Sequence, residues 1–458
     1  MYLGLPFTPN LDLDVMTKNR EEKGTKALGA LIPVLGCSRI PLPIRVQLVK
    51  SCLVPVLTYG CELWGMAEIR AVGPQRVLSQ ALRTVLGTRR SSAMAHATLG
   101  LELGIAPIHA IATAARARAL AKYPTSRCLI GDLVRNEPVR MRKWTWVTGS
   151  RLWLRRHIPA ALVEPHPAAR ATLVLNKLWK SMVKTDAKSR VTLGKYIERG
   201  YSTTNTFIKT GKYYYQTSRG LTWLARIRCG GFWSAHRLAN IGMLPADPWL
   251  TRCPCCLVNL QYGETLEHMF LHCALFADDR QQFLGDLVAP METTSDTDTV
   301  TCLCGGKALS ATGQELRIAR WETRRGGGDA FDAEHILGIE VENDNDGGIV
   351  VGDDDESTGD DVVNGEQERV DDSSVGSNHE QAVEQPVVVP PFVLVARYLQ
   401  SVVPKRMRLV SKLLISPRAN AVWNGMVVLA GEVEDVTAAE AVVAPDTELV
   451  DGRLDPPD

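Results

Sequence analysis

The sequence predicts a mainly α-helical protein with a long basic body and an acidic, disordered tail. Three observations support this prediction. Apolar residues recur at helical spacing through about the first 290 residues, cysteine and histidine gather between positions 253 and 273, and acidic residues accumulate after position 330. With 458 residues, the chain is long enough for two or three domains and a sizeable core.

The first helices are expected near the N-terminus. Helical periodicity begins near Val15 and should stop at Pro33. A second helix should begin at Pro43, a residue suited to a first helical turn, and should be kinked at Pro55. Its apolar face is wide, which is typical of a core helix, so Trp64 is expected to be a packing residue. Further helices are expected downstream, over residues 74–86 and 105–122.

Basic side chains are interleaved with alanine or with aromatic residues in three stretches, within 105–122, 139–156 and 209–233. Cations on phosphates and rings on bases are how single-stranded nucleic acid is bound. The alternative is that the rings are buried while the arginines reach out to water. The candidate nucleic-acid contacts are Arg116, Arg118, Arg140, Arg142, Lys143, Trp144, Trp146, Arg155, Arg156, Arg226 and Arg228.

The most informative stretch runs from Cys253 to Cys273. Cys253 and Cys256 are spaced so that one turn places both thiolates on the same side of a metal ion, and His268 and Cys273 follow at the start of a predicted helix. Three thiolates and one imidazole fill the tetrahedral shell of Zn²⁺, so the sequence predicts a closed structural zinc site.

Two of these ligands have a rival nearby. Cys255 could replace Cys256, and His272 could replace Cys273, since two histidines separated by three residues are a familiar zinc-finger spacing. A reduced cysteine cluster within a core is the alternative to a metal site.

The net charge of +1 hides a division of the chain. Residues 1–330 carry 44 Lys and Arg against 24 Asp and Glu, whereas residues 331–390 carry 1 against 18. This asymmetry is typical of a protein that binds a polyanion, although a soluble protein with evenly spread charge is the plainer alternative. Few large apolar residues remain in 291–385, so this segment is expected to be mostly disordered. An amphipathic helix is expected over 392–415, with a kink at Pro404.

The eleven cysteines are clustered rather than evenly spaced, and no secretory signal opens the chain. These features favour reduced thiols, metal binding and an intracellular location, in the nucleus or the cytoplasm. No apolar run approaches the about 20 residues that span a bilayer, so no membrane association is expected.

Several short motifs together resemble the C-terminal part of non-LTR (LINE-type) retrotransposon reverse transcriptases. Residues 2–4, Tyr-Leu-Gly, are similar to the box that follows the polymerase palm, and residues 54–64 are similar to the thumb signature. Residues 224–230 and the Cys253–Cys273 stretch are similar to the family's zinc-binding region. The order and spacing of these motifs carry the resemblance over residues 1–290.

The resemblance gives names to the parts of the helical protein. We expect a thumb-like helical bundle over residues 1–125, a basic-aromatic helical connector over 126–235 and a small zinc-knuckle module over 236–290. They are followed by the disordered acidic segment over 291–385 and a tail with one amphipathic helix over 386–458.

The family's polymerase chemistry needs aspartates that hold two divalent ions, and these lie upstream of the Tyr-Leu-Gly box. Because Met1 stands at that box, fingers and palm are expected to be absent, and the chain is not expected to polymerise by itself. Residues 276–279, Phe-Ala-Asp-Asp, spell the family's catalytic box. They follow the thumb motif in a helical pattern, so a charged helix face is the favoured interpretation.

The leading expectation is a truncated reverse-transcriptase-like protein that binds RNA, DNA or both through a basic helical body and a structural Zn²⁺ site. One alternative is a zinc-stabilised protein-interaction module, in which the zinc stretch and the 392–415 helix dock protein partners. Another is a thumb that completes a separate reverse-transcriptase palm in trans.

Overall fold

The computed structural model describes residues 12–88, 94–136, 145–201, 211–291, 294–309 and 389–414, together with the isolated residues 6, 208, 315, 316 and 318. Within this part the protein is mainly helical, as the sequence predicted. Its strands are the two-residue pair β1(Ala308–Leu309) and β2(Glu315–Leu316), which run antiparallel. The Tyr-Leu-Gly motif and most of the predicted acidic segment lie outside the described residues.

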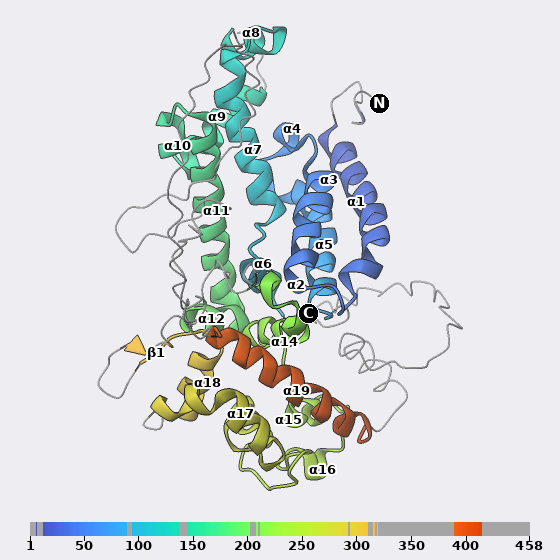
Figure 1. Ribbon diagram of the computed structural model, residues 1–458. Coiled ribbons are helices and arrows are strands. Elements are labelled where there is room, and N and C mark those ends of the chain that lie inside the picture. The colour runs from blue at the N-terminus through green and yellow to red at the C-terminus, as the bar shows by residue number, and fades with distance from the viewer. Residues whose placement is uncertain are drawn as a thin grey trace, which may run out of the picture.

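Helices of the first 125 residues pack into one bundle, in which α1 and α5 lie side by side (Figure 1). The elements are α1(Leu13–Leu35), α2(Leu42–Leu48), the π-helical turn η1(Val49–Leu53), α3(Val54–Thr58), α4(Cys61–Trp64), α5(Glu68–Val85), α6(His96–Leu103), α7(Ile108–Lys122) and η2(Tyr123–Thr125). Trp64 is fully buried, as a core helix requires.

Prolines shape this bundle in two ways. Helix α1 does not stop at Pro33 but continues to Leu35, because a proline in the last turn removes a single backbone hydrogen bond. Pro55, where the sequence predicted a kink, has a larger effect on the helix. The helix from Leu42 widens immediately before it into the π-turn, where the Val54 N–H donates to the carbonyl of Val49.

A second group of helices lies against α7. It comprises α8(Leu129–Arg135), α9(Trp146–His157), α10(Ala160–Val163), α11(Pro167–Ser189) and α12(Val191–Glu198). The long helix α11 runs along α7 (Figure 1). Buried residues such as Ala117, Leu154 and Val174 form a small core between α7, α9 and α11.

The third group surrounds the Cys253–Cys273 stretch. It comprises η3(Gly211–Thr217), α14(Ser218–Arg228), α15(Ala235–Asn240), α16(Ala246–Trp249), η4(His268–His272), η5(Ala274–Phe276), α17(Ala277–Val288), η6(Ala289–Met291), α18(Asp296–Leu303), the β1–β2 pair and α19(Pro391–Ser411). Helix α18 carries buried residues, so the prediction that the disordered segment begins at residue 291 was wrong.

Helix α19 returns from far along the chain to pack on α14 and α17 (Figure 1, red). Its apolar residues Phe392, Leu399 and Val403 are completely buried against these elements. The helix also runs continuously through Pro404, where a kink was expected. The apolar face that the interaction-module alternative assigned to a protein partner is therefore covered by the chain itself.

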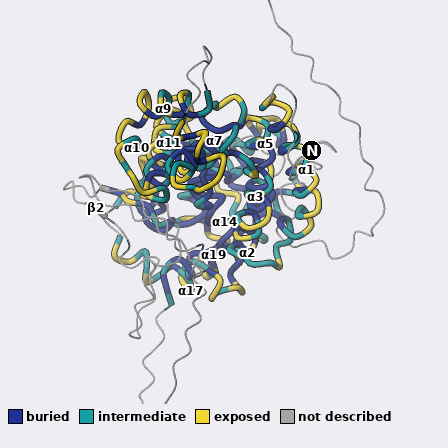
Figure 2. Tube along the Cα trace, turned by 90° about the horizontal axis from the view of Figure 1, so that it is seen from above, coloured by how far each residue is buried: buried dark blue, intermediate teal, exposed yellow. Residues whose placement is uncertain are grey.

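The main hydrophobic core extends from α1 to α19 and includes α14, so the predicted bundle and zinc module share one interior. Figure 2 shows this buried interior around α3, α14 and α19, whereas α9 and α10 carry many exposed residues. Among the described residues, no single helix has the length and apolar composition needed to cross a membrane; the bent pair of residues 96–103 and 108–125 passes that test only when combined.

Candidate metal centre

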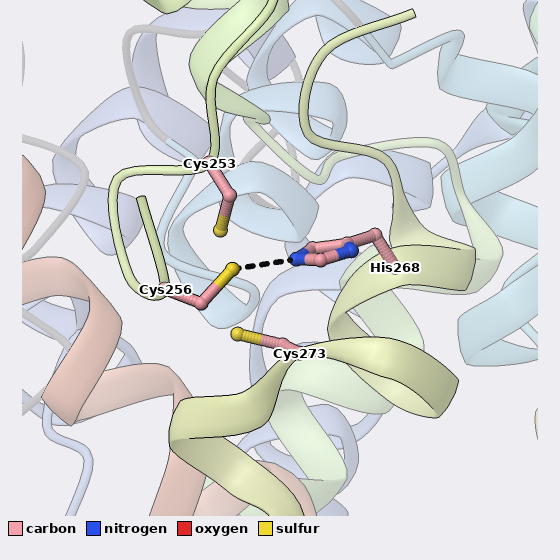
Figure 3. Close-up of side chains that lie close together, drawn as sticks. All are labelled: Cys253, Cys256, His268 and Cys273. Carbon is pink, nitrogen blue, oxygen red and sulfur yellow. Dashed lines mark hydrogen bonds between the residues drawn. The ribbon is translucent and has the colours of Figure 1, made fainter. Parts of the chain in front are cut away.

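The structure brings Cys253, Cys256, His268 and Cys273 together, with their side chains pointing toward one another (Figure 3). The four ligand atoms all lie within 4.8 Å of one another. The Cys256 Sγ lies 3.3 Å from Nε2 of His268. Three of the four residues are buried and Cys256 is half-buried, so the cluster is closed to bulk solvent on most sides.

A tight turn positions the first two ligands. The N–H of Leu257 donates to the carbonyl of Cys253 at 3.0 Å, and the N–H of Cys253 donates to the carbonyl of Val258 at 3.1 Å. The backbone N–H of Cys255 points at the sulfur of Cys253, at 3.4 Å. In this turn Leu257 adopts a φ of 61°, in the left-handed region that favours glycine.

A π-helical turn positions the other two ligands. In a regular α-helix, residues five apart are rotated by about 140° from each other, which would separate His268 from Cys273. Here the N–H of Cys273 donates to the carbonyl of His268 at 2.7 Å, which closes a wider turn and returns both side chains to one side. Thr265 begins the helix, since its hydroxyl accepts from the N–H of His268 at 3.2 Å.

The structure distinguishes the rival ligands. His272 is exposed and its Nε2 pairs with Asp296 at 2.6 Å, outside the cluster. Cys255 falls in a second group with Cys253 and Glu264, not in the four-ligand cluster. The geometry therefore favours Cys256 over Cys255, and Cys273 over His272.

The thiols of the cluster differ in acidity. Hydrogen bonds from neighbouring thiols, that of Cys253 foremost, lower the pKa of Cys273 to about 3. Burial raises the pKa of Cys256 to about 11. A cluster without metal thus keeps a proton on Cys256, and metal binding must release it.

The donor set fits a zinc ion. Two ligands at ordinary Zn–S and Zn–N lengths on a tetrahedron lie about 3.5 Å apart, close to the separation of Cys256 and His268. Three thiolates and one imidazole are soft or borderline ligands, which favour zinc over magnesium or calcium. All four positions are supplied by the protein, which is typical of a structural site.

Glu264, next to the cluster, is fully occupied in holding the surrounding elements. Its carboxylate accepts from Nε and Nη2 of Arg406, each at 2.6 Å, and from the backbone N–H of Ala235, also at 2.6 Å. Asp279 has a similar role, because it accepts from Ser401 at 2.6 Å and from Lys405 at 2.7 Å. Asp279 of the Phe-Ala-Asp-Asp box thus contacts helix α19, whereas Asp278 is exposed.

Three of the predicted nucleic-acid contacts are corrected by their burial. Arg116 donates to the Leu63 and Gly65 carbonyls, and burial lowers its pKa to about 10. Arg226 donates to the Leu86 and Gly87 carbonyls and is 2 % exposed. These guanidinium groups stabilise interior carbonyls and cannot meet a phosphate.

Arg228 is the third. It forms an ion pair of 2.9 Å with Glu102, and both side chains are fully buried. Its Nη1 also donates to the carbonyl of Cys304 at 2.8 Å. The prediction that this arginine contacts nucleic acid is wrong for the same reason.

The other candidates divide into three sets. Trp146 is half-buried, donates from its indole N–H to the carbonyl of Glu62 at 2.9 Å and is a packing residue. Arg118, Arg155 and Arg156 are exposed. The candidates outside the described residues are Arg140, Arg142, Lys143 and Trp144.

One basic surface was not predicted from the sequence. Helix α11 exposes Lys177, Lys180, Lys184 and Lys188, which follow one another at intervals of three, four and four residues. Such intervals place side chains on one face of a helix and were a readable signal. Because this stretch lacks interleaved aromatic residues, it does not match the basic-aromatic pattern on which the predicted contacts depended.

No family model matches the chain, and neither a curated protein nor a solved structure matches it. The resemblance to non-LTR reverse transcriptases therefore rests on the motifs themselves. Of these, residues 54–64 lie in the helical bundle, and the Cys253–Cys273 stretch forms the four-ligand cluster.

Proposed function

We propose that this chain is a reverse-transcriptase-like protein that binds RNA or DNA and contains one structural zinc ion, held by Cys253, Cys256, His268 and Cys273. The observation that carries the proposal is the geometry of this cluster, whose ligand atoms lie within 4.8 Å of one another. The spacing of the same residues carries the resemblance to the zinc-binding region of non-LTR reverse transcriptases.

The ion would supply a fixed point for segments that have few contacts of their own. Between Cys253 and Cys273 the chain forms short turns and an isolated bridge from Arg252 to Asn259 rather than long helices. Binding a metal in such a segment contributes to folding directly, since the ligands gather only in the folded chain. The zinc-bound stretch would then hold α17 and α19 in place.

Charge supports nucleic acid as the ligand. The basic excess of residues 1–330 attracts a polyanion, and Arg118, Arg155 and Arg156 are exposed on α7 and α9. The carboxylate of Asp279 is committed to Lys405 and Ser401, so the Phe-Ala-Asp-Asp box supports a structural contact rather than metal-ion catalysis. The proposed activity is binding.

A salt titration tests this function. The full zinc-loaded chain is used, because α19 completes the packing of the zinc module and a fragment ending before it would expose that core. Fluorescently labelled single-stranded RNA and a DNA duplex are titrated at several salt concentrations, with and without a zinc chelator. We expect the affinity to fall steeply with salt and to fall again when the metal is removed.

Two results would speak against the proposal. A folded, zinc-loaded chain that binds neither probe at low salt has no nucleic-acid-binding function. An affinity that does not change with salt would show that phosphate charges contribute nothing to binding.

A further inference from the structure

The second half of helix α11 exposes only lysine, serine and threonine side chains. Seven residues between 177 and 189 are exposed, and each is a lysine, a serine or a threonine. They are Lys177, Lys180, Ser181, Lys184, Thr185, Lys188 and Ser189. Ammonium and hydroxyl groups are among the protein groups that hydrogen-bond to phosphate oxygens.

The four lysines of this set form a narrow row. At 100° per residue they fall within an arc of about 80°, and from Lys177 to Lys188 they extend about 16 Å along the helix. The only acidic residue of α11, Asp186, projects to the opposite side of the helix. There it is half-buried, and its charge acts on His96. We call these four lysines the α11 lysine face.

Packing fixes the helix that carries this face. Val174 and Asn176 are buried in the first half of α11, and Trp179 and Val183 are packed against the main core. Among the described residues, none of the four lysines has a hydrogen-bond or ion-pair partner. The helix thus holds a row of positive charges that the rest of the described chain does not neutralise.

An ordinary solvated helix of this protein has a different pattern. On α1, the exposed Lys18 and Lys26 alternate with acidic residues such as Asp14 and Glu22. Solubility is served by mixed charge, whereas a row of one sign costs self-repulsion unless a ligand of opposite charge lies against it. The contrast between α1 and α11 favours a ligand-binding role for α11.

We propose that the α11 lysine face binds the phosphate backbone of RNA or DNA, with the neighbouring hydroxyls of Ser181 and Thr185 as further donors. This proposal rests on the proposed nucleic-acid-binding function and assigns it a surface. Lysine acts on phosphate as a point charge and reads no base, so the contact should be independent of sequence.

The test is a matched pair of double variants of the full, zinc-loaded chain. Lys180→Gln with Lys184→Gln removes two charges from the centre of the face, and Lys18→Gln with Lys26→Gln removes two exposed charges from α1. Glutamine is a good helix former, so both helices should persist. Circular dichroism and zinc content confirm folding, and binding of the RNA and DNA probes is measured from low to high salt.

Affinity falls as salt rises, and the plot of log affinity against log salt has a negative slope. We expect this slope to be less steep in the α11 variant, by about 1.4 for a single strand or about 1.8 for a duplex. If both proteins bind equally at about 1 M salt, the variant should bind the single strand about 25-fold more weakly than the wild type at about 0.1 M salt. The α1 variant should keep the slope of the wild type. Lys180→Arg with Lys184→Arg should also keep it, because the charge is retained.

The outcomes separate this proposal from the function on which it rests. If the wild type binds and the folded α11 variant keeps its slope, the face is not a contact, although the nucleic-acid-binding function stands. An equal loss in both Gln variants would also overturn the assignment to α11. If the wild type binds neither probe, the function itself fails.

Discussion

Arg406 and Glu264 form an ion pair that is enclosed within the protein. The Nε of Arg406 lies 2.6 Å from Oε1 of Glu264, and each side chain is 1 % exposed. Burial alone would lower the pKa of Arg406, but the Glu264 carboxylate outweighs it and raises that pKa. Since the two residues are 142 positions apart, their contact fastens α19 to the segment that contains the candidate metal ligands.

Breaking this pair should destabilise the protein strongly. Arg406→Met leaves a buried carboxylate without its cation, and Glu264→Gln leaves a buried guanidinium without its anion, so each should cost about 3–5 kcal/mol in the free energy of unfolding. The double variant buries no net charge and should cost less than the sum of the two. Urea denaturation of the zinc-loaded wild type, the two single variants and the double variant measures the free energy of unfolding of each. Single variants that each cost less than about 1 kcal/mol would show that the pair is not closed to water.

Gly220 should be required for the docking of α19. A methyl group added at this position on α14 would come within 1.8 Å of the Ala396 carbonyl oxygen, and the atom in the way is backbone that cannot turn aside. Gly220→Ala should therefore separate the two helices and lower the unfolding midpoint. The matched control is Gly29→Ala on α1, where nothing lies within 4 Å. That change should stabilise the helix by about 0.5–1 kcal/mol, and equal effects of the two substitutions would contradict the α14–α19 contact.

His109 should make stability depend on pH. Burial lowers its pKa below the ordinary value of 6.5, so the folded protein resists a proton that the unfolded chain accepts. Stability should therefore fall as pH drops below 6.5. His109→Gln cannot take this proton, and between about pH 7.5 and about pH 5.5 it should lose less free energy of unfolding than the wild type does. Equal losses in urea denaturation at the two pH values would refute this role.

The ligand assignment can be tested with neighbouring residues as controls. Cys256→Ala and Cys273→Ala should each abolish tight zinc binding, because a four-ligand shell loses one donor. Cys255→Ala and His272→Ala should keep it, since these side chains lie outside the cluster. A colorimetric zinc-release assay on the purified variants measures the difference. Loss of zinc from Cys255→Ala with retention in Cys256→Ala would reverse the assignment.

Local pattern was sufficient to predict the helices of the N-terminal bundle, the C-terminal helix and the grouping of Cys253, Cys256, His268 and Cys273, whereas helix α11 was not predicted as a separate element. The spacing of Cys253 and Cys256 implied a turn, and the residues around Thr265 implied a helix start. What the pattern lacked was the π-turn, which depends on the hydrogen bond between Cys273 and His268. Without it, the sequence favoured Cys273 but left His272 open as an alternative ligand.

Tertiary contacts explain the errors. The sequence alone predicts exposed cations at three helix positions that are buried in the structure, Arg116, Arg226 and Arg228. Their carbonyl and carboxylate partners come from elements that are distant in the sequence. The partner of Glu264 lies beyond the acidic segment, so no local pattern could indicate Arg406. Periodicity identifies a helix and its apolar face, but the long-range partners of its polar residues follow only from the fold.

The most direct test of the account is the metal content of the purified full chain, measured by mass spectrometry of the elements. We predict one zinc ion per chain, lost together with tertiary structure when a chelator is added. A folded chain that contains no metal, and whose stability is unchanged by chelator, would show that Cys253, Cys256, His268 and Cys273 are a reduced cluster and would contradict the central claim.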